Sequence, residues 1–201
     1  MKITAIKAQT KRAGRYSLFI DGKFSFGLDG DELLRLGLVS GQEITTKDIE
    51  KIKQENELDK LYDKTLNLLS FRPRSSWEIQ DYLKRKKQPT ERIEKILNKL
   101  SEYGYVNDED FARRWVENRR LLKPISSLKL KAELKQKRVS DEIINKVLTQ
   151  DQTDERQVLK NLIERKAHRY PSQQKLMQYL ARQGFRYDDI KTALSEYQAG
   201  N

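Results

Sequence analysis

The chain has 201 residues and no Cys, which excludes disulfide bridges and thiolate metal sites. Hydrophobic residues make up 36% of the sequence, charged residues make up 35%, and the mean hydropathy is -0.87, so we expect a thin hydrophobic core and a large surface. No apolar run approaches the roughly 20 residues that cross a bilayer, and the first residues lack the pattern of a secretory signal. The sequence therefore predicts a cytoplasmic protein that does not enter a membrane.

The charge of the chain favours an anionic partner. Lys and Arg number 41 against 30 Asp and Glu, so the net charge is +11 and the isoelectric point is near 9.6. Nucleic acid is the leading candidate, because such a charge attracts polyanions at long range and binding releases their counterions. Segments 58–106 and 107–150 carry +4 each, whereas 1–57 carries +1 and 151–201 carries +2. We therefore expect the positive surface mainly in the middle of the chain.

The first part of the chain shows the alternation of strands. Asp21-Gly22 separates two alternating segments, 15–20 and 23–28, and predicts a hairpin because a type I′ turn needs positive φ at both central residues. Residues 3–9 are expected to add a third antiparallel strand through a turn at 11–14, since a lone hairpin is only marginally stable. A short helix at about 30–36, closed by Gly37, and helices from Thr46 onward are expected to follow.

One apolar pattern occurs three times along the helical part. Ser75, Ser126 and Ser172 are each followed by Ile or Leu four and eight positions later, at successive offsets of 51 and 46 residues. The same offsets relate a second apolar block, whose members are Ile93, Ile96 and Leu97, then Ile144, Val147 and Leu148, then Ile190, Ala193 and Leu194. The two blocks predict tandem repeats of three helices, in which the serine caps the second helix and Ser75 forms a capping box with Glu78.

These patterns predict a mainly α protein, with tandem three-helix repeats in an elongated curved array that follows a small N-terminal antiparallel β-sheet module. The expected segments are 1–57 for the module and 58–106, 107–150 and 151–201 for the three repeats. One repeat of this length buries little apolar surface, so neighbouring repeats are expected to share interfaces. Gly104, a natural helix end, and Asn107, a natural helix start, predict a tight join between the first two repeats.

The residue types of catalytic and metal sites have simpler explanations here. The sequence has no G-x-x-x-x-G-K-[ST] or G-x-G-x-x-G phosphate loop. The single His168 is best explained as a surface residue near a helix end, and the acidic groups at 108–110 and 188–189 fall in expected first helical turns, where carboxylates favour the helix dipole. The sequence therefore predicts no enzymatic activity, no cofactor and no metal.

Aromatic side chains are candidates for stacking on nucleic-acid bases. Trp77 and Trp115 are the largest of them, but their helical phase favours packing in small cores, and we expect the same of Tyr82, Tyr103 and Tyr105.

Basic side chains are the remaining candidates for contacts with a partner. The run 84–87 has more cations than a helix end requires, whereas the arginines of 113–120 have acidic neighbours at helical spacing, so pairing and partner contact stay open alternatives for them. The cations of 129–138 have only Glu133 within their own helix and form the preferred patch, with a solvated helix face as the alternative. The full set is Lys84, Arg85, Lys86, Lys87, Arg113, Arg114, Arg119, Arg120, Lys129, Lys131, Lys135, Lys137 and Arg138.

Three stretches, "LLSFRPRSSWEIQDYLKRK", "GYVNDEDFARRWVENRR" and "ISSLKLKAELKQKRVSDEIINKVL", resemble the RecX family of recombinase regulators in their order and spacing. The similarity covers about 58–198, and "YSLFIDGKFSFGL" resembles the β extension of a subset of that family. One departure is Pro124 in "LLKPISS", where the family usually has a Gly. The resemblance implies that the matched residues Arg72, Pro73, Arg74, Ser75, Gly104, Tyr105, Asp108 and Phe111 mainly determine the fold.

The resemblance also implies a function. It implies a protein that binds the RecA filament on single-stranded DNA and modulates it, commonly by blocking growth, promoting disassembly or lowering ATP hydrolysis and strand exchange. The expected partners are thus a RecA-type recombinase filament and DNA, single-stranded or duplex, bound by a monomer without sequence preference. The alternative is a helix-turn-helix-like regulator acting directly on duplex DNA, but the expected middle helices carry Lys more than the Arg, Asn and Gln that read base edges.

Overall fold

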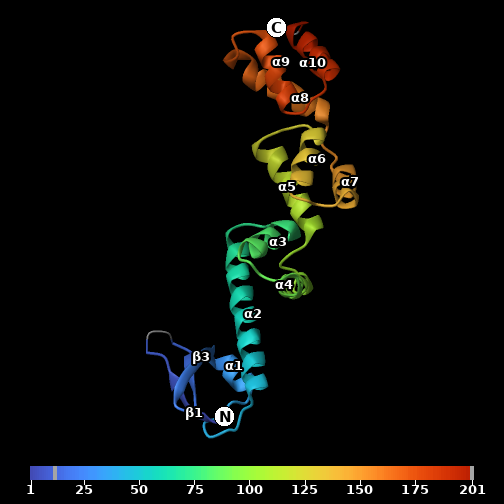
Figure 1. Ribbon diagram of the computed structural model, residues 1–201. Coiled ribbons are helices and arrows are strands. Elements are labelled where there is room, and N and C mark those ends of the chain that lie inside the picture. The colour runs from blue at the N-terminus through green and yellow to red at the C-terminus, as the bar shows by residue number, and fades with distance from the viewer. Residues whose placement is uncertain (11–12, 200–201) are drawn as a thin grey trace. The chain divides into compact units, whose positions relative to one another are not determined.

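The computed structural model describes residues 1–10 and 13–199, which form one small sheet and a series of helices (Figure 1). The chain divides into two compact units, Met1–Leu68 and Leu69–Asn201. In the described part of the chain, no helix is both long and apolar enough to span a membrane.

The first unit contains a three-stranded antiparallel sheet of the predicted kind. Its strands are β1 (Ile3–Ala8), β2 (Arg15–Ile20) and β3 (Lys23–Asp29), in the order β1-β2-β3. Asp21 and Gly22 have φ values of 45° and 79°, so the hairpin turn has the two positive φ angles that the sequence predicted. The turn expected at 11–14 falls partly on residues 11 and 12, which lie outside the described residues.

One face of the sheet is covered within the first unit. The short helix α1 (Gly30–Arg35) follows β3 with Asp29 as its N-cap, and the long helix α2 runs from Thr46 to Phe71. The core cluster joins sheet residues such as Leu18 and Leu28 to Ile49 and Ile52 of α2. Because α2 contains no Gly or Pro, it continues without interruption past residue 57, where the sequence analysis placed the end of the module.

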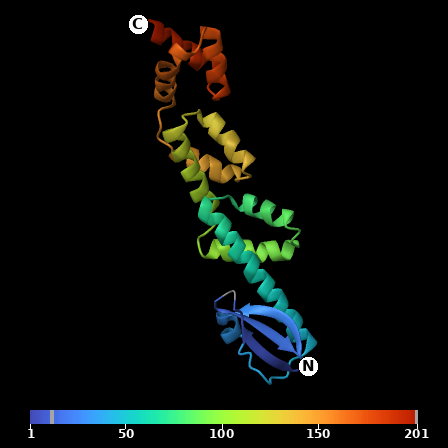
Figure 2. The ribbon, with the colours of Figure 1, turned by 90° about the vertical axis from the view of Figure 1, so that its left-hand side faces the viewer.

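The three predicted serines each begin a helix. The Oγ atoms of Ser75, Ser126 and Ser172 accept a hydrogen bond from the backbone N–H three residues later, and Ser75 forms the predicted capping box with Glu78. The helices of the second unit are α3 (Ser76–Arg85), α4 (Thr90–Glu102), α5 (Asp108–Leu122), α6 (Ser127–Gln136), α7 (Asp141–Gln150), α8 (Glu155–Lys166), the short 3-10 helix η1 (Ala167–Arg169), α9 (Gln173–Arg182) and α10 (Tyr187–Ala199). Both views show α5, α6 and α7 beside one another (Figure 1, Figure 2).

The predicted apolar positions form the cores of the repeats. Ile79 and Leu83, Leu130 and Leu134, and Leu176 and Leu180 are at most 4% exposed. Helices α5–α7 enclose one apolar cluster, and α8–α10 enclose another. The helical phase taken from the sequence is therefore confirmed in each second helix.

The aromatic residues follow the packing prediction only in part. Trp115 packs against the cluster of α5–α7, and its Nε1 donates a hydrogen bond to Glu133 at 2.9 Å. The prediction is wrong for Tyr103 and Tyr105, which are 64% and 57% exposed. These tyrosines flank Gly104, whose φ of 72° ends α4, so the helical phase used to place them no longer applies there. Trp77 lies in the first turn of α3 and is 37% exposed.

Polar contacts join the first and second repeats at what we call the first joint. The Oγ of Ser75 donates to the carbonyl oxygen of Lys137 at 2.9 Å, and the backbone N–H of Ser76 donates to Oδ1 of Asp108 at 2.7 Å. The start of α3 is thus bound to the end of α6 and to the start of α5. Ser75 is completely buried in this contact.

The second joint repeats this arrangement between the second and third repeats. The backbone N–H of Ser126 donates to the carbonyl oxygen of Gln183 at 3.1 Å, and the N–H of Ser127 lies 3.3 Å from the carboxylate oxygens of Glu155. Ser126 and Ser127 stand 51 residues after Ser75 and Ser76, and Gln183 stands 46 residues after Lys137. The repetition in the sequence therefore extends to the contacts between repeats.

The residues that follow the second helix of each repeat occupy equivalent positions, at the same offsets of 51 and 46 residues. Lys87, Arg138 and Gly184 have φ values of 55°, 56° and 90°, in the left-handed region that Gly adopts most easily. At Gly184 the second joint adds a steric requirement, because a Cβ there would lie 2.4 Å from Oγ of Ser126 and 2.7 Å from Cβ of Lys129. Gly104 has a similar φ but no atom within 4 Å of its Cβ position.

We expect Gly184→Ala to destabilise the protein more than Gly104→Ala. Both substitutions place a Cβ at positive φ, which costs about 1–2 kcal/mol, but only Gly184→Ala also overpacks a contact, at a further cost of about 1–3 kcal/mol. Denaturant unfolding of the two variants measures the difference. Equal losses would contradict the close approach at the second joint.

Glu78 binds two cationic side chains at the first joint. Its carboxylate accepts hydrogen bonds from Arg72 at 2.9 Å and from Nζ of Lys137 at 2.7 Å, and its side chain is only 10% exposed. Burial favours the protonated form, but the two cationic donors outweigh burial and hold the pKa of Glu78 at about 2 instead of 4.5.

The depressed pKa of Glu78 makes its contribution to stability depend on pH. A group with a lowered folded-state pKa stabilises the fold above its unfolded pKa and loses that effect as the pH falls through the folded value. We therefore expect the difference in unfolding free energy between the wild type and Glu78→Gln to be constant above about pH 5 and to shrink between pH 4.5 and 2. Urea unfolding across this range measures it, and a difference that does not change with pH would refute the assignment.

Candidate nucleic-acid and protein interface

The cations of residues 84–87 gather at the end of α3 and are all exposed. Arg85 pairs with Asp81 at 2.6 Å, and Lys86 lies 5.8 Å from the ring centroid of Tyr82. Within the described residues, Lys84, Lys86 and Lys87 have no carboxylate partner. A helix end is negative, so it stabilises one or two of these charges, and the others remain available to an anionic partner.

The first two arginines of α5 form the pairs that their spacing suggested. Arg113 contacts Glu109 at 3.1 Å, and Arg114 contacts Asp110 at 2.9 Å. Lys146 of α7 also contacts Glu109, at 2.7 Å, and this carboxyl group has a lowered pKa mainly because of the Lys146 hydrogen bond. Exposed pairs of this kind exchange readily with solvent and contribute little to stability.

The next two arginines of α5, Arg119 and Arg120, pair with acidic side chains outside α5. Arg119 pairs with Glu133 of α6 at 2.7 Å instead of the nearby Glu117. Its guanidinium also lies 4.9 Å from the ring centroid of Trp115. Lys137 lies 5.3 Å from the centroid of the same ring. Two cations of the protein itself therefore lie beside the Trp115 ring, which leaves less of the ring for stacking on a base.

Arg120 is a structural residue of the second repeat. Its guanidinium donates to Asp151 at 2.7 Å, to the carbonyl oxygen of Ile125 at 2.6 Å and to Ser127 at 2.9 Å, and its side chain is 10% exposed. Burial opposes the charge of Asp151, but hydrogen bonds from Thr153 and Arg120 hold the pKa of this carboxyl below its ordinary value. A partner would have to break this network to reach Arg120, so this arginine serves the fold and is not a candidate contact.

The preferred patch at 129–138 is more strongly neutralised than the sequence suggested. Lys135 pairs with Asp141 at 2.9 Å, Lys137 pairs with Glu78 at 2.7 Å, and Glu133 is engaged by Arg119. The expectation of poor neutralisation is therefore wrong for Lys135 and Lys137. These acidic partners come from outside α6, so spacing along α6 alone does not reveal them.

Three cations of the patch keep no carboxylate partner in the part of the chain that the structure describes. Lys129 is half-buried beside the second joint, and Lys131 donates to the amide oxygen of Asn145 at 3.0 Å. Arg138 is exposed at its left-handed position after α6. These side chains are the members of the patch that a phosphate or carboxylate can bind without displacing an ion pair.

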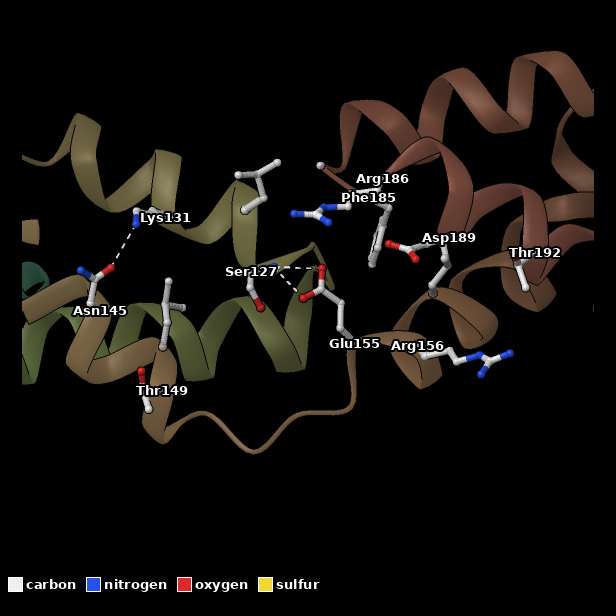
Figure 3. A pocket seen from close by; sticks show the side chains of 14 residues that line it. Ser127, Lys131, Asn145, Thr149, Glu155, Arg156, Phe185, Arg186, Asp189 and Thr192 are labelled. Atoms are coloured by element: carbon white, nitrogen blue, oxygen red, sulfur yellow. Dashed lines mark hydrogen bonds between the residues drawn. The ribbon is translucent and has the colours of Figure 1, made fainter.

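A cleft of about 910 Å³ lies between the second and third repeats (Figure 3). Leu128, Leu148 and Phe185 give it an apolar part, while Lys131 and Arg186 lie on either side of Ser127. Sequence reasoning did not select Arg186, because the cleft exists only where two repeats meet. The remaining lining residues are Ser127, Asn145, Thr149, Glu155, Arg156, Leu159, Gly184, Asp189 and Thr192.

His168 is exposed and lies in the short 3-10 helix η1, in agreement with the surface role expected for it. Asp108, Glu109 and Asp110 lie in the first turn of α5, and Asp188 and Asp189 lie in the first turn of α10, as expected. No group of three or more His, Asp or Glu side chains with metal-site geometry occurs among the residues described.

Four family models match successive parts of the chain. The "Regulatory protein RecX N-terminal domain" matches residues 1–45, and the first, second and third three-helix domains of RecX match residues 62–100, 107–148 and 154–194. The matches follow the order of the sheet and the three sets of helices.

Relatives and solved structures agree with these models. The regulatory protein RecX of Listeria monocytogenes serotype 4a (strain HCC23) is 35% identical over 98% of this chain and 76% of its own length, and that of Bacillus subtilis (strain 168) is 31% identical over 99% and 78%. A crystal structure of regulatory protein RecX matches with a TM-score of 0.76 and 28% identity, covering 96% of this chain and 98% of that one. The RecX structure from Lactobacillus salivarius matches with a TM-score of 0.62 and 28% identity over 72% and 99%. The chain therefore belongs to the RecX family.

Proposed function

We propose that this protein binds a RecA-type recombinase filament on single-stranded DNA and inhibits its assembly, ATP hydrolysis and strand exchange. The observation that carries the proposal is the match of four RecX models in order along the chain, together with relatives that are named regulatory proteins. The protein acts in the cytoplasm as a monomer and carries out no reaction of its own, so its effect on ATP hydrolysis passes through the recombinase.

The repeated construction of the second unit supports a repeating partner. The first and second joints connect equivalent positions of successive repeats, so equivalent surfaces recur along this unit. A filament offers equivalent binding surfaces at regular intervals, so more than one repeat can be engaged at once, which raises the affinity beyond that of a single contact. The segments 58–106, 107–150 and 151–201 are the repeats in this proposal, and 1–57 is the module that precedes them.

Four exposed and two partly buried cations provide the proposed contacts. The set consists of the candidates that have no carboxylate partner within the described residues, namely Lys84, Lys86, Lys87, Lys129, Lys131 and Arg138. Lys87 and Arg138 are informative members, since each occupies a left-handed position where Gly is more stable. Retaining a long cation at such a position costs stability, and contact with phosphates or acidic side chains gives a reason to retain it.

A recombinase assay tests the proposed function directly. We expect the protein to lower the rate of DNA-dependent ATP hydrolysis and the yield of strand exchange when added below the recombinase concentration, because blocking growth at filament ends needs few molecules. A protein of similar charge and unrelated fold is the control for DNA masking. The proposal fails if neither activity changes at sub-stoichiometric or saturating amounts.

Substitution of the two cations at left-handed backbone positions should raise stability and weaken binding. We expect Lys87→Gly/Arg138→Gly to unfold at a higher denaturant concentration, since relief of positive φ at a non-Gly residue is worth about 1 kcal/mol or more per site. The same variant should co-sediment less with recombinase filaments because two cations are lost, and its difference from the wild type should shrink at high salt, which screens the lost contacts. Lys95→Gly on α4, which removes an exposed cation paired with Glu91, is the matched control for charge. Unchanged co-sedimentation of the double variant would remove these two residues from the proposed surface.

A further inference from the structure

The N-terminal module separates its charges along the sequence. Residues 1–28 contain six Lys or Arg and a single acidic residue, Asp21, whereas residues 29–57 contain four Lys or Arg and eight Asp or Glu. The net charge of 1–57 is small because a basic segment, which contains the strands, is followed by an acidic segment, which contains helices. A basic sheet attracts an anionic ligand that the acidic helices repel.

The sheet carries an aromatic pair on the face opposite its core. Leu18 and Ile20 of β2 are 1% and 7% exposed, so Phe19 between them lies on the other face. Phe19 is paired with Phe24 of β3, and the two rings meet edge to face with centroids 5.9 Å apart. Phe24 is 61% exposed. Such a cross-strand pair stabilises the hairpin, but most of the Phe24 ring remains in water.

A basic side chain accompanies this aromatic pair. Nζ of Lys7, from β1, lies 5.3 Å from the centroid of the Phe19 ring. Lys7 has no carboxylate partner within residues 1–10 and 13–199. Lys23 pairs with the core-facing Ile20, so it lies on the other face of the sheet. The face thus combines exposed aromatic surface with a cation that no acidic side chain of the described residues neutralises.

We propose that this face of the sheet is a separate binding site for single-stranded nucleic acid, in which bases stack on Phe24 and Phe19 and a phosphate contacts Lys7. Stacking on an aromatic side chain is available to every base, and the flanking lysine binds the phosphate backbone, so the site binds without sequence preference. Bases in a duplex are already stacked on one another, so the site favours single strands. The site belongs to the first unit and does not depend on the proposed inhibition of a recombinase.

Binding of a fluorescein-labelled oligo-dT to the full chain, followed by anisotropy without any recombinase, tests the site. We expect Phe24→Ala to raise the Kd about 5- to 150-fold, which corresponds to the loss of stacking on one base. Phe24→Tyr should restore binding, and Leu34→Ala, which truncates a side chain of α1 that is 80% exposed, should have no effect. Lys7→Ala should reduce the slope of log K against log salt by about 0.7. A Kd for Phe24→Ala within twofold of the wild type would overturn the proposal.

A cross-linking experiment distinguishes this site from the cations of the second unit. Irradiation of the wild-type protein with an oligonucleotide that contains 5-iodouracil should produce adducts within residues 16–35, because the halogenated base reacts with the aromatic side chain on which it stacks. Adducts confined to the second unit would overturn the proposal. Displacement of the oligonucleotide by an acidic peptide at a lower concentration than by unlabelled oligo-dT would also overturn it, since the face would then be a protein-binding surface.

Discussion

The serines that begin α3 and α6 each cap their helix and contact the next repeat, and the second unit depends on these two contacts. Ser75 accepts a hydrogen bond from the N–H of Glu78, which caps α3, and donates its own proton to the carbonyl oxygen of Lys137 in the next repeat. Ser126 caps α6 in the same way, while its backbone N–H binds the carbonyl oxygen of Gln183. A serine fits at position 75 because its hydroxyl supplies both a donor and an acceptor in a completely buried position. The third serine, Ser172, is exposed and makes no such contact with another repeat among the described residues.

The polar contacts within the second unit also determine which cationic side chains are paired inside the protein and which are free to contact a partner. Glu78 and Asp151 are acidic side chains that collect cations from other helices, so Lys137 and Arg120 are held by the protein itself. A net charge of +11 therefore overstates the charge that is free for binding. Cations at helix ends, such as Lys87 and Arg138, remain exposed because the chain reverses there and no acidic side chain of the described residues pairs with them. The surface that we propose for the partner therefore includes the loops that follow α3 and α6, together with cations on these two helices.

Features set by neighbours along the chain could be predicted from the sequence. Asp21-Gly22 identified the hairpin because its turn requires positive φ, and the spacing of Leu130 and Leu134 from Ser126 gave the helical phase that buries them. Features set by other helices could not be predicted. The contact between Lys137 and Glu78 joins residues 59 positions apart, and the cleft that contains Arg186 forms only where two repeats meet. The exposure of Tyr103 was missed because α4 ends at that residue.

Hydrogen exchange of three amides tests the repeated joint most directly. The N–H groups of Ser76 and Ser126 lie at helix starts, where no bond within the helix protects them, so any protection must come from Asp108 and Gln183 of the next repeat. The account predicts slow exchange at these two amides and fast exchange at Ser172, which is an N-cap like Ser126 but whose N–H has no acceptor from another repeat among the described residues. Equally fast exchange at all three amides would contradict it, because the repeats would then be connected by the chain alone.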